Sequence, residues 1–123
     1  MKIRIRIGQL SMEAELNDSA TARMIEEALP VKTSFNTWGE EIYFAVPVES
    51  ELDETAREEV EVGDLGYWPS GRAFCIFFGR TPISTEGKIL PASAVNIIGK
   101  VLGDATRFKE VMDEGEVILE RAE

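Results

Sequence analysis

The sequence of 123 residues contains no histidine and a single cysteine. Without histidine, imidazole-based catalytic triads, imidazole general bases and histidine-containing zinc sites are excluded. Cys75 has no partner for an internal disulfide, and it lies in the apolar run 73–78, where a thiol usually serves as an inert packing group. A metal site would have to be built from carboxylates alone, and no pattern in the sequence places one. No cofactor is indicated either.

The chain also lacks long apolar runs and an excess of basic charge. No segment approaches the roughly 18 apolar residues that a membrane span requires, and residues 1–7 alternate charged residues with isoleucine, unlike a signal peptide. We therefore expect a cytoplasmic protein without a membrane partner. The net charge of −10 argues against nucleic-acid binding, because neutralised phosphates supply most of that affinity. One glutamine and three asparagines beside many glutamates and arginines favour a heat-tolerant protein.

The charge is unevenly distributed along the chain. Residues 65–101 carry four basic residues and one acidic residue, Glu86. This mildly positive segment is either core with few charges of either sign or the place for an anionic or carbonyl-rich ligand.

The spacing of apolar residues predicts short strands and two short helices. Period-two alternation predicts a hairpin over 2–7 and 10–16 and a strand over 41–46. The unbroken apolar run 73–78 predicts a strand covered on both faces, and further strands are expected over 60–62, 92–101 and 116–121. The segment Asn17-Asp18-Ser19 is expected to supply the N-cap of the first helix, which carries an apolar stripe of Ala20, Met24, Ile25, Ala28 and Leu29. Asp104 is expected to cap the second helix. The acidic stretch 47–59 is expected to be a solvated connection with at most one helical turn. Seven or eight strands predict one mainly β domain, a barrel or a sandwich.

Four segments carry a family resemblance. Residues 36–44 (Asn-Thr-Trp-Gly-Glu-Glu-Ile-Tyr-Phe), 63–73, 77–82 and 91–99 resemble the small prokaryotic cyclophilin-like proteins of unknown function. The resemblance covers residues 1–123, and it implies a single cyclophilin-like domain: a closed eight-stranded β-barrel capped by two short helices. The Phe-His-Arg strand and the Gln-Gly-Gly-Asp segment of prolyl isomerases with this fold are absent. Related domains also occur in subunits of amide-hydrolysing and oxoproline-processing enzymes.

Aromatic residues supply the candidate ligand-binding side chains. Nine of the ten aromatic residues lie between Phe35 and Phe78. Trp38 and Trp68 stand beside glycine-containing turns, where an indole either lines a groove or caps the core. Together with Tyr43 and Tyr67 they are the aromatic candidates for ligand contact.

Two arginines and one glutamate are the candidates for chemistry. Arg72 either donates two parallel hydrogen bonds to a ligand carboxylate or carbonyl, or pairs with a surface glutamate. Arg80 offers the same alternatives at the other end of the strand 73–78, about 20 Å away. Glu41 is a desolvated acid or base if its strand face turns into the barrel, and part of a solvated corner with Glu40 if that face turns outward.

These residues indicate a module that binds an extended peptide or a small amide-containing ligand without the usual isomerase residues. One alternative is a divergent peptidyl-prolyl isomerase that uses Arg72 or Arg80. Another is a ligand-binding subunit of an amide-hydrolysing or oxoproline-processing enzyme. The amides of Asn36 and Asn96, which lie among apolar residues, are expected to hold loops rather than to touch a ligand.

Overall fold

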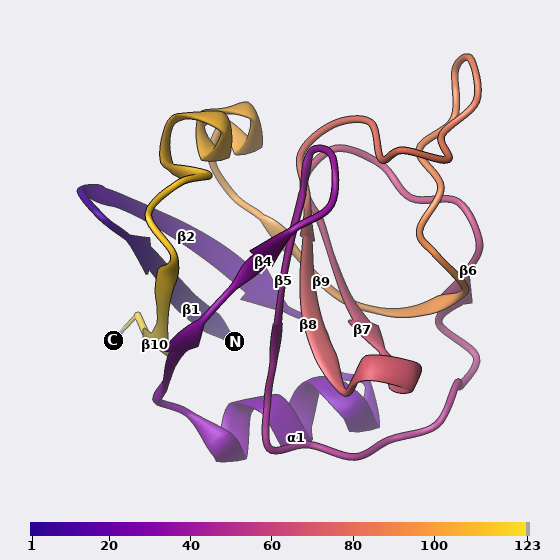
Figure 1. Ribbon diagram of the computed structural model, residues 1–123. Helices are drawn as coiled ribbons and strands as arrows, with labels where there is room; N and C mark the ends of the chain where they lie inside the picture. The colour runs from indigo at the N-terminus through magenta and orange to yellow at the C-terminus, as the bar shows by residue number, and fades with distance from the viewer. Residues whose placement is uncertain (123) are drawn as a thin grey trace.

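The computed structural model describes residues 1–122, which form one antiparallel sheet with helices at its two ends. In this part of the chain ten strands are paired in the order β3-β10-β1-β2-β9-β7-β8-β5-β4, and β6 pairs with β9. The strands are β1 (Lys2–Ile7), β2 (Leu10–Leu16), β3 (Val31–Ser34), β4 (Asn36–Thr37), β5 (Glu41–Ala45), β6 (Ala56–Arg57), β7 (Asp64–Trp68), β8 (Ala73–Phe77), β9 (Val95–Val101) and β10 (Glu116–Arg121). The helices are α1 (Ala20–Ala28) and the 3-10 helices η1 (Pro69–Gly71) and η2 (Ala105–Val111). Helix α1 and helix η2 lie at opposite ends of the sheet (Figure 1).

The two ends of this strand order belong to one short stretch of chain. Strand β3 and strand β4 are separated only by Phe35. On one side Val31 pairs with Leu119 of β10, and on the other Thr37 pairs with Ile42 of β5. The sheet therefore begins and ends in the same segment, residues 31–37.

The first hairpin has the predicted bounds. Ile3, Ile5 and Ile7 are buried while the residues between them are more exposed, as the period of two requires. Gly8 in the turn has φ of 57°, a conformation that glycine adopts without the cost of a side chain.

Helix α1 begins and ends where the sequence predicted, but its buried face is different. The Ser19 side chain accepts a hydrogen bond from the Ala22 amide (3.3 Å), and the helix stops before Pro30. The predicted apolar stripe is buried only in part, because Ile25 is buried whereas Met24 is 37% exposed, and the polar residue Thr21 is buried as well. The Thr21 hydroxyl is satisfied inside the protein by the hydroxyl of Ser50 at 2.8 Å.

Strand β8 is covered on both faces, as its unbroken apolar sequence predicted. Phe74 and Ile76 join the main core, which also contains the β5 residues Ile42 and Phe44. The opposite face contributes Ala73, Cys75 and Phe77 to a second, smaller cluster with Val60 and Val95. The segment between β8 and β9 crosses this second face, and its Ile89 packs against the smaller cluster.

Several predicted elements were wrong. Strand β7 was missed, and residues 60–62 form no strand because Val60 makes only an isolated bridge to Ile89. Strand β9 starts at Val95 rather than at residue 92, and the connection 47–59 contains the two-residue strand β6 instead of a helical turn.

In residues 1–122 no helix has the length and apolar character needed to cross a membrane.

Candidate functional site

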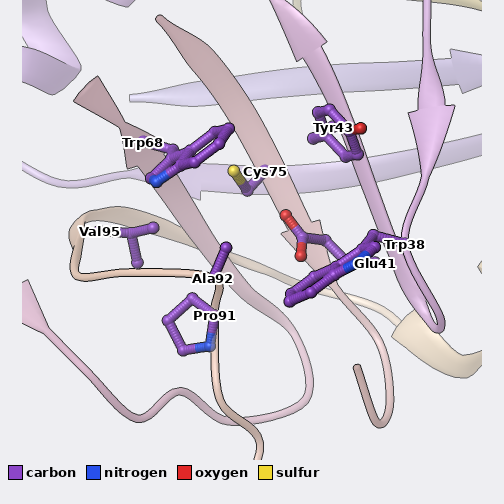
Figure 2. Close-up of a pocket in the computed structure, with 8 residues that line it drawn as sticks. All are labelled: Trp38, Glu41, Tyr43, Trp68, Cys75, Pro91, Ala92 and Val95. Carbon is purple, nitrogen blue, oxygen red and sulfur yellow. The ribbon is translucent and has the colours of Figure 1, made fainter. Parts of the chain in front are cut away.

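A pocket of about 240 Å³ lies on the face of the sheet that carries the second, smaller cluster of buried residues. Figure 2 shows the side chains that surround it. They are Trp38, Glu41, Tyr43, Trp68, Cys75, Pro91, Ala92 and Val95.

Strand register builds the floor of the pocket. Tyr43 of β5 stands directly opposite Cys75 of β8, and Glu41 stands opposite Phe77 two positions further along. Because side chains alternate along a strand, Glu41, Tyr43 and Cys75 share the face turned away from the main core. The wall comes from the segment between β8 and β9 and from the first residue of β9, Val95.

Trp38 is held by a tight turn between β4 and β5. Its backbone amide donates a hydrogen bond to the Glu41 carbonyl oxygen (2.9 Å). Gly39 follows with φ of 62°, and a Cβ atom at this position would lie 2.7 Å from the carbonyl oxygen of Arg80. Glycine is therefore required both by the backbone conformation and by the close approach of the segment that begins at Arg80.

Trp68 is fixed from two sides. Its indole Nε1–H donates a hydrogen bond of 2.7 Å to the Ser93 hydroxyl, which ties the ring to the wall segment. Gly71 approaches the ring so closely that a Cβ atom at this position would lie 2.7 Å from Cε3 of the indole. The hydrogen bond and the close packing together hold the ring at the edge of the pocket.

Glu41 is the charged residue of the pocket lining, and only 5% of it is exposed. Burial raises the pKa of its carboxyl group from 4.5 to about 7, and an interaction with the Cys75 thiol acts in the lowering direction. Two environments were predicted for Glu41, a desolvated one inside the barrel and a solvated corner beside Glu40, and neither describes it fully. Its face points away from the main core, yet the group is desolvated because the segment between β8 and β9 covers that face.

The adjacent glutamate behaves in the opposite way. The Glu40 carboxylate forms an ion pair with Lys109 Nζ at 3.1 Å and accepts a hydrogen bond from the Arg80 amide (3.2 Å). Of the two neighbouring carboxyl groups, Glu40 is therefore neutralised at the surface and Glu41 enters the pocket.

Cys75 is buried, as predicted, but it also lines the pocket. Burial is the main cause that raises the pKa of its thiol well above the usual range, and the charge of Glu41 adds to it. The side chain is therefore a neutral thiol at physiological pH, a soft apolar surface with a weak donor.

Tyr67 and Arg72 lie outside the pocket. The Tyr67 side chain is completely buried in the main core, where its hydroxyl donates a hydrogen bond of 2.6 Å to the Val48 carbonyl oxygen. The exposed Arg72 guanidinium lies 3.5 Å from the carboxylate of Glu49, which is the second of the two roles predicted for it.

Arg80 also lies outside the pocket and holds a loop instead. Its guanidinium donates hydrogen bonds to the carbonyl oxygens of Ser84 (3.0 Å) and Thr85 (3.4 Å). Among the residues that the structure describes, the lining contains no basic side chain. The pocket thus brings together Trp38, Glu41, Tyr43 and Trp68, and the mild positive charge of residues 65–101 is not gathered in it.

Four lining residues were not among the candidates: Cys75, Pro91, Ala92 and Val95. Their participation depends on strand register and on the path of the chain between β8 and β9, which no local pattern encodes.

Asn96 holds a loop as predicted, since its side chain accepts a hydrogen bond from the Asp53 amide (2.9 Å) and donates one to the Glu51 carbonyl oxygen (2.9 Å). Asn36 lies exposed on β4. Residues 1–122 contain no cluster of three or more cysteine, aspartate or glutamate residues arranged to hold a metal ion.

The topology and the comparisons with known proteins define the class. The chain belongs to the cyclophilin-like family, whose model matches residues 1–120, and this confirms the resemblance seen in the sequence motifs. The solution structure of the hypothetical protein AF2241 from Archaeoglobus fulgidus is similar, with 44% identity over 99% of this chain and 95% of that one and a TM-score of 0.82.

A second solved structure is similar in fold alone. The structure of McbB in complex with tryptophan has 15% identity and a TM-score of 0.71 over 98% of this chain, which spans 44% of that one. No curated protein sequence matches the chain.

Proposed function

We propose that this protein is a small-ligand binding module and that the pocket between Trp38, Tyr43 and Trp68 is its site. The observation that carries the proposal is a hollow of about 240 Å³ whose aromatic and aliphatic lining surrounds a single carboxyl group. Such a combination, mostly apolar with a few converging polar groups, is typical of ligand sites. The volume lies below the range of about 300–1,000 Å³ that is usual for drug-sized ligands, which favours a compact molecule or one side chain of a peptide.

The distant structural match supports the same class of function. McbB was determined in complex with tryptophan, so a chain that contains this fold can be found with a compact aromatic ligand. The likeness lends support at the level of the fold, and the choice of pocket rests on the geometry of this chain.

A rigid site needs a rigid floor, and we infer that the sheet closes into a barrel. The support for this inference is that residues 31–37 supply both terminal members of the strand order, pairing with β10 on one side and with β5 on the other. Closure would leave β5 and β8 without a free edge beside the pocket.

The isomerase alternative receives no support from the pocket. It depended on Arg72 or Arg80, and both guanidinium groups bind protein groups elsewhere, Arg72 with Glu49 and Arg80 with its own loop. A coupled isomerase assay on Xaa-Pro peptides tests it. Catalysis that is lost in Arg72→Ala or Arg80→Ala would restore the alternative and displace the binding role.

The experiment for the binding role is an NMR titration. We expect indole and L-tryptophan to shift the indole N–H signals of Trp38 and Trp68 and the amide signals of residues 92–95. Trp38→Ala should weaken binding at least tenfold, whereas Leu52→Ala should leave it unchanged, because Leu52 is an exposed apolar residue outside the lining. Equal affinities for wild type and Trp38→Ala would refute the proposal, as would the absence of shifts at the pocket with indole, with L-tryptophan and with the organic cations named in the next subsection.

A further inference from the structure

Glu41 is a buried residue whose carboxyl group has no basic partner among residues 1–122. The residue is 5% exposed, and the causes that shift its pKa are burial and the Cys75 thiol, with no basic side chain or backbone amide of the described residues among them. A buried carboxylate without a cation or strong donors is costly, and it is usually paired. In Figure 2 the carboxyl group points toward the middle of the pocket. The missing partner is therefore to be sought in the ligand.

The walls around this carboxyl group are aromatic. Figure 2 shows Trp38, Tyr43 and Trp68 on three sides of it. The face of an aromatic ring attracts cations, by about 0.5–1 kcal/mol at exposed sites and about 2 kcal/mol or more where water is excluded. Because the Trp68 N–H group is already bonded to Ser93, this indole has its ring surface, and not its donor, to offer a ligand.

We propose that the pocket binds a compact organic ammonium ion, with Glu41 as its counter-ion and the rings of Trp38, Tyr43 and Trp68 as its cage. The proposal rests on the binding function inferred above and names the class of its ligand. An anionic ligand would meet the Glu41 carboxylate with no basic side chain to offset the repulsion. The net charge of −10 also attracts cations to the protein at long range.

Binding of a cation should be coupled to proton release. The pKa of Glu41 is about 7, so near pH 7 about half of the molecules carry a proton there, and a bound cation would favour the ionised form. The titratable groups that face Glu41 are Tyr43 on β5 and Cys75 on β8, whereas Pro91, Ala92 and Val95 on the opposite wall carry no charge. Affinity should therefore rise between pH 6 and pH 8 through Glu41 alone.

The test compares cations with a neutral molecule of the same shape. Tetramethylammonium, choline and benzyltrimethylammonium are titrated by calorimetry at pH 8, together with 3,3-dimethylbutan-1-ol, in which carbon replaces the choline nitrogen. We expect wild type to bind at least one of the cations, and to bind choline at least tenfold more tightly than the alcohol. Calorimetry at pH 7 in buffers of different ionisation enthalpy should detect release of about half a proton per cation.

Two glutamine variants identify the counter-ion. Glu41→Gln should weaken choline binding at least tenfold and leave the affinity for the alcohol within twofold. Glu40→Gln, the matched control, should change neither affinity, because Glu40 is paired with Lys109 outside the pocket.

The outcomes separate this proposal from the binding function itself. If indole binds at the pocket but none of the cations does, or if Glu41→Gln leaves the preference for choline over the alcohol unchanged, the ammonium proposal is wrong and the binding function stands. If neither indole, L-tryptophan nor any cation shifts the signals of the pocket, both are wrong.

Discussion

Replacement of Glu41 by glutamine should change the stability of the protein in a way that depends on pH. Glutamine has nearly the same shape as a protonated glutamate but cannot ionise, so Glu41→Gln removes the titration and leaves the packing of the pocket floor in place. The carboxyl group has a pKa of about 7 in the folded chain against 4.5 in a solvated one. The native state therefore holds its proton more tightly than the unfolded state does.

The direction and the size of the stability change follow from this difference between the two pKa values. Between the two pKa values the native state binds more protons than the unfolded state, so the free energy of unfolding of wild type falls as the pH rises. At about 1.4 kcal/mol for each pKa unit, wild type should lose roughly 2.5 kcal/mol between pH 5 and pH 8 through this residue. The variant should not lose that amount. Its stability relative to wild type should rise by the same roughly 2.5 kcal/mol over this interval.

Urea unfolding of both proteins at the two pH values measures this effect. Taking the difference between wild type and variant cancels the titration of all other groups, and the Cys75 thiol stays protonated because its pKa is raised well above the usual range. Glu40→Gln is the matched control, with no such trend expected. A stability difference that stays constant between pH 5 and pH 8, or a Glu41 ¹³C carboxyl signal that titrates near 4.5, would refute the reasoning.

Three further substitutions probe the supports of the pocket. Ser93→Ala removes the acceptor of the Trp68 indole, so we expect that N–H signal to move while stability changes by less than about 1 kcal/mol, as is usual for an exposed hydrogen bond; an unmoved signal would contradict the contact. Gly71→Ala places a methyl group against the Trp68 ring, and unfolding experiments should show a loss of about 1–3 kcal/mol together with weaker indole binding; unchanged binding would mean that the ring position does not matter. Tyr67→Phe strands the buried Val48 carbonyl oxygen and should cost about 1–3 kcal/mol with indole affinity intact, so a loss of affinity in a stable variant would place Tyr67 in the site after all.

Local patterns predicted the fold well where each segment has one buried face. The isoleucines of β1 and the strict alternation of β2 indicated these strands clearly. The segment Asn17-Asp18-Ser19 and the later Pro30 marked the two ends of α1. Strand β7 was missed because Gly66 interrupts its apolar pattern and turn-forming residues surround it. In the structure a Cβ atom on Gly66 would lie 3.0 Å from Cγ2 of Val95, so this glycine allows two strands to approach closely.

The lining of the candidate site was predictable only in part, because some of its residues are placed by local turns and others by contacts between distant segments. Trp38 and Trp68 were found through their glycine-containing turns, and Tyr43 through the alternation of β5. The burial of Glu41 was not predictable, since Glu40 has the same chemistry, and only the cover supplied by a segment some 40–50 positions further along distinguishes the two. Arg72 and Arg80 were selected for what a guanidinium can do, and neither lies in the pocket.

The two sides of the pocket are built from structures of different kinds. The carboxyl group lies on paired strands, β5 and β8, whose opposite face packs into the main core. The opposing wall belongs to the connection between β8 and β9, which holds its shape through its own contacts, such as the hydrogen bond from Thr81 Oγ1 to the Leu90 carbonyl oxygen (2.5 Å). If the pocket is the binding site proposed above, exchange of that connection should change which molecule it accepts while Glu41 keeps its position.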